Sequence, residues 1–325
     1  MRRPDVLTDR YLAMPSAIQA LATSLVLQLI SIAIPMLLAT PVLAQSGERR
    51  ANRPGEIPEQ VREIHNLKYS VHNSRNADAM VVLPKDIDVS KPVNVTIYNH
   101  GWYDTARSAV GNARLTEQMR SAPPNTVLVV PEWQVKPGTY GPKANFQGRY
   151  TAANFAQEQL QEIFNRTPEL KATKLGDIQN INIISHSAGI NPTESTLYRN
   201  PKMAQKINSV TLLDSLYDRS GLNKWIKANI RDLVSGRKRF HNIFSEGTEG
   251  NSRVQAKFVA DELAHYSGGR YSSSRFMDLS NRPLSVEQLR DYPIVFKLTR
   301  VPHRDMPKQM VETIEQAAAL SKPEH

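Results

Sequence analysis

Short apolar runs rich in β-branched residues alternate with longer amphipathic stretches along most of this chain, and this alternation constrains its fold more than any other feature. The runs with the length of buried strands are 93–98, 126–130, 181–184, 209–213, 240–244 and 292–296. Helical patterns lie between them, near residues 108–121, 154–164, 192–205, 221–234, 252–266 and 305–320. Such alternation requires crossover connections, so the sequence predicts an α/β fold with a mostly parallel central sheet and helices on both faces.

The N-terminal region has the organisation of a secretory signal. Three arginines within the first ten residues precede a nearly continuous apolar stretch over 17–43, which ends before Ala44 and the polar Gln45. We therefore expect residues 1–44 to be a signal peptide that is cleaved after Ala44, giving a periplasmic or secreted protein. The apolar stretch is also long enough to span a bilayer, so the alternative is an uncleaved membrane anchor.

Residues 45–66 are polar and include Pro54 and Pro58, which is typical of a flexible lead-in. No second domain boundary is evident after them. We therefore expect one folded domain over residues 67–325.

Composition excludes several kinds of chemistry. The chain has no cysteine, so it has no thiol nucleophile, thiolate ligand or disulfide. Its histidines lack ligand-like spacing and neither nucleotide-binding glycine motif occurs, so we expect no metal and no other cofactor. The net charge of +10 favours association with an anionic envelope polymer or membrane surface over any specific nucleic acid, and a solvated basic surface without a partner is the simpler alternative.

The stretch 185–189, Ser-His-Ser-Ala-Gly, directly follows the apolar run 181–184 and precedes a predicted helix. It matches G-x-S-x-G with a serine in the first glycine position. Small residues at these positions allow the sharp strand-to-helix turn that projects a serine nucleophile towards its base. Ser187 is therefore the candidate nucleophile, and an ordinary turn rich in serine and glycine is the alternative.

Polar residues also follow the other apolar runs, at the sheet edge where ligands of parallel sheets bind. The set at these strand ends is His100, Glu132, Ser187, Asp214, Glu246 and His303. Serine, acid and histidine thus occur in this order along the chain, each at a strand end. An ordered set of this kind arises by chance much less often than any one member.

With this order the sequence resembles the α/β-hydrolase superfamily of serine esterases and lipases over about residues 69–320. In that superfamily the histidine loop precedes a final helix, as residues 301–306 precede the helical stretch 308–320 here. The resemblance implies that Ser187 attacks an ester of a small molecule or polymer, with His303 as general base and an acyl-enzyme intermediate. An amide or peptide bond is the close variant.

The acid of this constellation has two candidates. Asp214 follows the run 209–213, and Glu246 follows the next run, 240–244. Superfamily custom places the acid after the later strand, which favours Glu246. Aspartate is the commoner acid, and a minority of members use the earlier strand, so we assign Asp214 and keep Glu246 as the alternative.

The resemblance further implies an oxyanion hole formed by the backbone N–H groups of Ala188 and Trp102. Of the neighbouring histidines, His100 is expected to shape the loop after its strand. His186 is expected to point away from the reacting centre.

Aromatic residues Trp102, Tyr103, Trp133 and Tyr140 would stand near the same edge of the sheet and form a wall for an acyl group or sugar, although core packing is their commoner fate. Residues 134–150 form either a flap over the site or an exposed loop. The leading hypothesis is thus an exported serine hydrolase. Its rival is a non-catalytic protein of the hydrolase fold that binds an anionic envelope polymer.

Overall fold

The computed structural model describes residues 60–67, 77–132, 158–217, 220–270, 277–278 and 283–320, and their strands form one sheet. The strands are β1 (Gln60–Ile64), β2 (Ala79–Leu83), β3 (Val93–Asn99), β4 (Thr126–Pro131), β5 (Ile178–His186), β6 (Ile207–Leu213), β7 (Arg239–Phe244), β8 (Met277–Asp278) and β9 (Ile294–Leu298). Their order across the sheet is β1-β2-β4-β3-β5-β6-β7-β9-β8. The pairs β1–β2 and β2–β4 are antiparallel and all other pairs are parallel.

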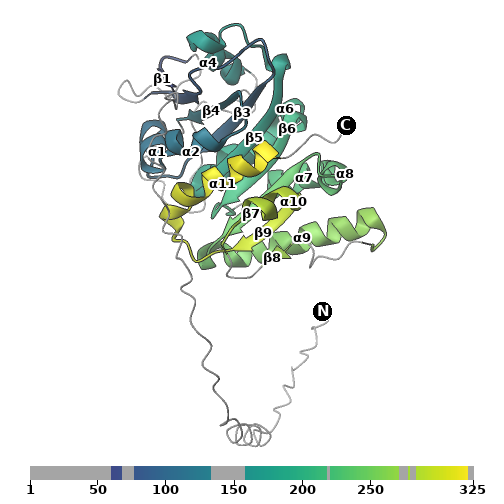
Figure 1. Cartoon of the computed structure of the whole chain (residues 1–325). Coiled ribbons are helices and arrows are strands. Elements are labelled where there is room, and N and C mark those ends of the chain that lie inside the picture. Colours follow the sequence, from purple (N-terminus) through teal and green to yellow (C-terminus); the bar gives the residue numbers. More distant parts are fainter. Residues whose placement is uncertain are drawn as a thin grey trace, which may run out of the picture. The chain divides into compact units, whose positions relative to one another are not determined.

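Helices cover both faces of this sheet (Figure 1). Those of the described residues are α1 (Ala106–Asn112), α2 (Leu115–Gln118), α4 (Leu160–Arg166), α5 (Ile190–Arg199), α6 (Pro201–Lys206), α7 (Ser220–Ala228), α8 (Ile230–Val234), α9 (Glu249–Ser267), α10 (Val286–Asp291) and α11 (Met306–Leu320). Side chains of α4 to α9 join the apolar cluster on one face, and those of α1, α2, α10 and α11 join the cluster on the other. Successive strand residues alternate between the two clusters, as Leu128 and Val129 do. No helix in the described ranges combines the length and the apolarity that a bilayer crossing requires.

The predicted α/β fold is confirmed, and the six predicted strands correspond to β3, β4, β5, β6, β7 and β9. The flexible lead-in expected over residues 45–66 is wrong for its last part, since residues 60–64 form the edge strand β1. This strand pairs with β2 and buries Ile64, while Val61 and Glu63 are exposed. A polar edge strand with one solvated side gives the same composition as a lead-in, which is why the pattern was misleading.

A very close approach between α5 and β3 shapes the turn after β5. A Cβ atom at Gly189 would lie 2.1 Å from the backbone oxygen of Asn99, so only glycine fits there. The buried hydroxyl of Ser185 lies 2.6 Å from the Thr193 hydroxyl, which donates to the Gly189 oxygen at 3.0 Å. Asn99 Nδ2 donates to the same Thr193 oxygen at 2.7 Å. The serine in the first glycine position of the motif therefore belongs to a buried polar network that ties β5, α5 and β3 together.

A second buried polar contact attaches α11 to the sheet. Thr96 Oγ1 of β3 donates to Glu315 Oε1 at 2.8 Å, and Glu315 is only 1% exposed. Burial raises the pKa of Glu315 to about 7, although the hydrogen bond from Thr96 acts against this shift. Because α11 directly follows the loop that carries His303, this contact fixes the helix at the end of that loop to the central strand.

Replacing Gly189 by alanine is expected to lower the free energy of unfolding by about 1–3 kcal/mol or more, because the new methyl group must displace the backbone of β3. Equilibrium unfolding in urea measures this loss. Gly111→Ala is the matched control, since a Cβ at this helical position of α1 meets nothing within 4 Å. It should leave the free energy unchanged or raise it by up to about 1 kcal/mol. Equal stability of the two variants would contradict the close approach.

Candidate active site

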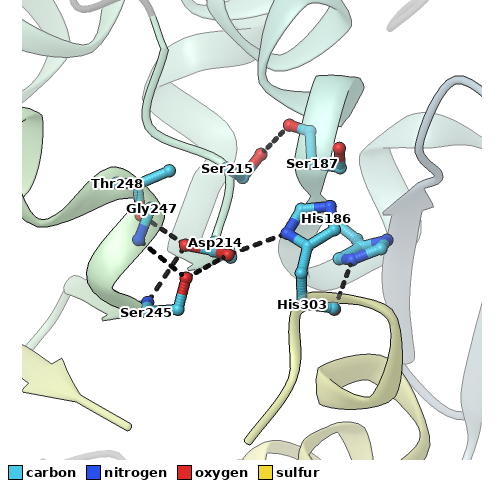
Figure 2. A network of polar contacts seen from close by, with 8 residues as sticks. All are labelled: His186, Ser187, Asp214, Ser215, Ser245, Gly247, Thr248 and His303. Atoms are coloured by element: carbon cyan, nitrogen blue, oxygen red, sulfur yellow. Dashed lines mark hydrogen bonds and ion pairs between the residues drawn. The ribbon is translucent and has the colours of Figure 1, made fainter. Parts of the chain in front are cut away.

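Three of the polar residues at strand ends converge at the carboxyl edge of the sheet (Figure 2). Ser187 begins the turn after β5, and Asp214 follows β6, the next strand in the sheet. His303 begins a short 3-10 turn over His303–Asp305, between β9 and α11. The sheet therefore supplies each residue from a different strand end, as the sequence pattern predicts.

Ser187 lies on a strained turn. Its φ of 53° is in the left-handed region, which costs a residue with a side chain about 1–3 kcal/mol. Ser215 Oγ donates to the Ser187 carbonyl oxygen at 2.6 Å and thereby holds the turn. Burial and the charge of Asp214 raise the pKa of the nearby Tyr217, and an interaction with the Ser187 side chain acts against them. Sequence reasoning missed Tyr217, whose only signal is its position three residues beyond Asp214.

The loop after β3 lies directly against Ser187. A Cβ atom at Gly101 would be 3.1 Å from Ser187 Cβ and 3.6 Å from Ser187 Oγ. Ala188 is buried and Trp102 is half-buried, and no hydrogen-bond partner of the buried Trp102 Nε1 is found among the described residues. Of the two residues predicted to supply oxyanion-hole amides, Ala188 directly follows Ser187 and Trp102 directly follows Gly101, which packs against the serine.

The predicted aromatic wall is only partly within the described structure. Tyr103 is 88% exposed, so it does not pack in the core. Trp133, Tyr140 and the stretch 134–150 lie outside the described residues. The expectation that His100 shapes its loop agrees with the 2.8 Å contact between its Nδ1 atom and the Gly101 oxygen.

Asp214 is 2% exposed, and its carboxylate accepts several hydrogen bonds. His303 Nδ1 lies 2.8 Å from Oδ2, Ser245 Oγ lies 2.6 Å from Oδ2, and the Ser245 N–H donates to Oδ1 at 3.0 Å. Thr248 Oγ1 donates to Oδ1 as well. Burial alone would raise the pKa of Asp214, but the hydrogen bonds from His303, Ser245 and Thr248 outweigh it and hold the pKa well below its usual range.

An ionised Asp214 determines which nitrogen of His303 carries the proton. A carboxylate only accepts hydrogen bonds, so His303 Nδ1 must be the donor in their 2.8 Å contact. The neutral ring then presents Nε2 as an unprotonated base. Figure 2 shows the His303 ring between Asp214 and Ser187.

Glu246, the alternative acid, begins the 3-10 turn Glu246–Thr248 after β7 and is exposed. Its neighbours Ser245 and Thr248 face inward instead and bind the Asp214 carboxylate. The structure therefore brings Asp214 to His303 and leaves Glu246 at the surface.

The expectation that His186 points away from the reacting centre is wrong. Its ring centroid lies 4.7 Å from that of His303, and its Nε2 atom lies 2.9 Å from the His303 carbonyl oxygen. Strand alternation explains this position: Ser185 faces Thr193 of α5, so the next side chain returns to the face covered by α11. The two-residue period of β5 is the signal that would have placed His186 correctly.

Within the described ranges, no group of three or more histidine, aspartate or glutamate residues is arranged to hold a metal ion. The described residues bring together a hydroxyl, an imidazole and a carboxylate at the carboxyl edge of the sheet.

Comparison with protein-family models and with curated protein sequences gives no match. Solved structures do match. A mutant of the feruloyl esterase module from Clostridium thermocellum, complexed with sinapinate, aligns with a TM-score of 0.50 and 12% identity over 82% of this chain and 91% of that one. The serine hydrolase FphF of Staphylococcus aureus, described as fluorophosphonate-binding, aligns with a TM-score of 0.43 and 9% identity over 79% and 96%. At such identities the likeness concerns the fold, and together with the sheet order it shows that this chain has the α/β-hydrolase fold.

Proposed function

We propose that this protein is a serine hydrolase that cleaves an ester bond, with Ser187 as nucleophile, His303 as general base and Asp214 as the acid that orients it. One observation carries the proposal above all: the buried carboxylate of Asp214 lies 2.8 Å from His303 Nδ1, beside a serine on a strained turn after β5. A carboxylate, an imidazole and a hydroxyl in this order form the relay that activates a serine.

In the first half of the reaction, Ser187 Oγ attacks the ester carbonyl carbon while His303 Nε2 takes the serine proton. Asp214 stabilises the imidazolium that forms. The N–H groups of Ala188 and Trp102 stabilise the oxyanion, and the loss of one such donor typically raises the barrier by about 3 kcal/mol. The intermediate then collapses, His303 returns the proton to the departing alkoxide, and the acyl group remains on Ser187 as an ester.

In the second half, His303 removes a proton from water, which attacks the acyl carbon. Collapse of the second intermediate returns that proton to Ser187 Oγ and releases the carboxylic acid.

An ester is favoured over an amide because the matching solved structures include esterases, although the same residues cleave both bonds in principle. A non-catalytic protein that binds an anionic envelope polymer through its basic surface is the second candidate, and the net charge of +10 favours it. Covalent labelling of Ser187 by a reactive probe separates the two candidates, because the hydrolase should be labelled and the non-catalytic binding protein should not.

Ser187→Ala is expected to abolish ester turnover and covalent labelling by a fluorophosphonate probe while the protein stays folded, because no other hydroxyl occupies the apex of this turn. Turnover of a short-chain to long-chain ester series and gel fluorescence measure the two effects. Ser215→Ala is the matched control. It removes a neighbouring hydroxyl that binds the Ser187 backbone but leaves the Ser187 hydroxyl itself in place, so labelling should persist. A folded parent protein that the probe does not label would favour the binding candidate instead.

Asp214→Asn is expected to lower kcat by up to about 10⁴-fold, because an amide no longer fixes the Nδ1–H tautomer of His303 or stabilises its cation. Glu246→Gln should leave kcat unchanged, since Glu246 is exposed at the turn after β7. Thr248→Val is the control for stability: it removes another hydrogen bond to Asp214 but leaves the His303 contact in place. Steady-state kinetics and thermal melts of all three variants measure these effects. A collapse of kcat in Glu246→Gln alone would reassign the acid.

Export is a further part of the proposal, and it depends on the sequence of residues 1–44. A polypeptide that is processed after the apolar stretch should begin at Gln45. Intact mass spectrometry of protein from an exporting host measures this directly. A mass that still includes residues 1–44 would support the membrane-anchored alternative.

A further inference from the structure

Among the described residues, His186 is a titratable residue that contacts His303 but has no part in the proposed mechanism. Its Nε2 atom lies 2.9 Å from the His303 carbonyl oxygen. Figure 2 marks this contact with a dashed line. A carbonyl oxygen only accepts hydrogen bonds, so Nε2 must carry the hydrogen and donate it. Nδ1 is then the unprotonated nitrogen of a neutral ring. It has no hydrogen-bond partner among the described residues and faces Gly101, where a Cβ atom would lie 3.5 Å away.

The two histidine rings also pack against each other. Their centroids are 4.7 Å apart with the planes tilted by 36°. The two residues differ in burial: His186 is 6% exposed, whereas the His303 side chain is 40% exposed. The buried His186 ring therefore packs against a His303 side chain that is partly open to solvent.

His303 is thus held at two separate points. Asp214 binds the edge of its ring, and His186 binds its backbone carbonyl and covers one ring face. His303 begins a 3-10 turn between β9 and α11, in which the Asp305 N–H donates to the Pro302 oxygen at 2.8 Å. The His186 contact is the side-chain hydrogen bond that the described structure gives to the backbone of His303 itself, and the Asp214 contact is the one to its ring.

His186 remains suited to this role when His303 becomes charged. Burial and, second, the charge on His303 lower the pKa of His186 to about 4. The hydrogen bond to the His303 carbonyl and the negative charges of Asp104 and Asp214 act in the opposite direction but do not cancel these effects. At neutral pH His186 therefore stays neutral and donates to the same oxygen whether or not His303 holds a proton.

We infer that His186 is a positioning residue for His303: it anchors the backbone of the proposed base and keeps its ring against Asp214. This inference rests on the proposed function for its catalytic consequence, but the contact itself is a structural claim about the free protein. The group required at position 186 is a neutral hydrogen-bond donor that reaches as far as Nε2 of histidine.

Three variants of His186 test the inference. Phenylalanine keeps a planar ring but has no donor, and glutamine offers an amide N–H at about the position of Nε2. Asparagine is the matched control, because it has the same amide on a shorter side chain that does not reach the carbonyl. Proton NMR of each free variant tests for the low-field resonance of the His303 Nδ1–H. In the parent protein this resonance is assigned by its loss in Asp214→Asn.

The resonance should be retained in His186→Gln and lost or broadened in His186→Phe and His186→Asn. The value of kcat should follow the same order, with a loss on the order of 10- to 100-fold in the latter two and little change in KM, because a small displacement of a catalytic group affects the chemical step more than binding. Thermal melts should show His186→Phe about as stable as the parent. This result would exclude general unfolding as the cause.

Persistence of the resonance and of kcat in His186→Phe would overturn the inference, as would an equal loss in all three variants. Absence of the resonance in the parent protein would overturn it as well. These outcomes are separate from failure of the proposed function: a protein that shows the resonance pattern but neither turnover nor probe labelling would keep the structural role of His186 and lose the hydrolase mechanism.

Discussion

The contact between Gly189 and the backbone of Asn99 is the constraint on which the rest of the site depends. With no room for a Cβ atom between them, α5 starts directly against β3, and the chain must turn sharply after β5. Ser187 takes up this turn with its left-handed backbone, and Gly101 packs against it from the next loop. The buried network of Ser185, Thr193 and Asn99 offsets part of the strain. A rigid turn of this kind presents one hydroxyl at a fixed position.

Electrostatics then decide what that hydroxyl can do. Asp214 is buried, yet it stays ionised because His303, Ser245 and Thr248 all donate to it. An ionised carboxylate imposes one tautomer on His303 and leaves Nε2 free for the serine proton. Two buried groups near the sheet contrast with it: Glu315 and His186 are shifted by burial towards their neutral forms. Charge is thus stabilised in the site only where several donors converge.

The sequence predicts the fold and the location of the site more fully than the contacts among the residues of the site. Parallel strands that are buried on both faces appear in the sequence as continuous apolar runs. The polar residues that directly follow these runs place Ser187, Asp214 and His303 at strand ends. Edge strand β1 lacks such an apolar run, because Ile64 is its only fully buried residue. The choice between Asp214 and Glu246 depends on the turn after β7, where Ser245 and Thr248 face inward and Glu246 faces solvent, and no local pattern specifies that orientation. The contact of His186 with His303 joins residues 117 positions apart, so only the alternation along β5 hints at it.

Direct detection of an acyl group on Ser187 tests the central claim most directly. The parent protein is mixed with an activated short-chain ester, quenched in acid within the first turnovers, digested and analysed by mass spectrometry. The account predicts one added acyl mass on the peptide that contains Ser187, and its disappearance once the substrate is exhausted. Steady ester turnover without any acylated peptide, or with the acyl group on another residue, would contradict it.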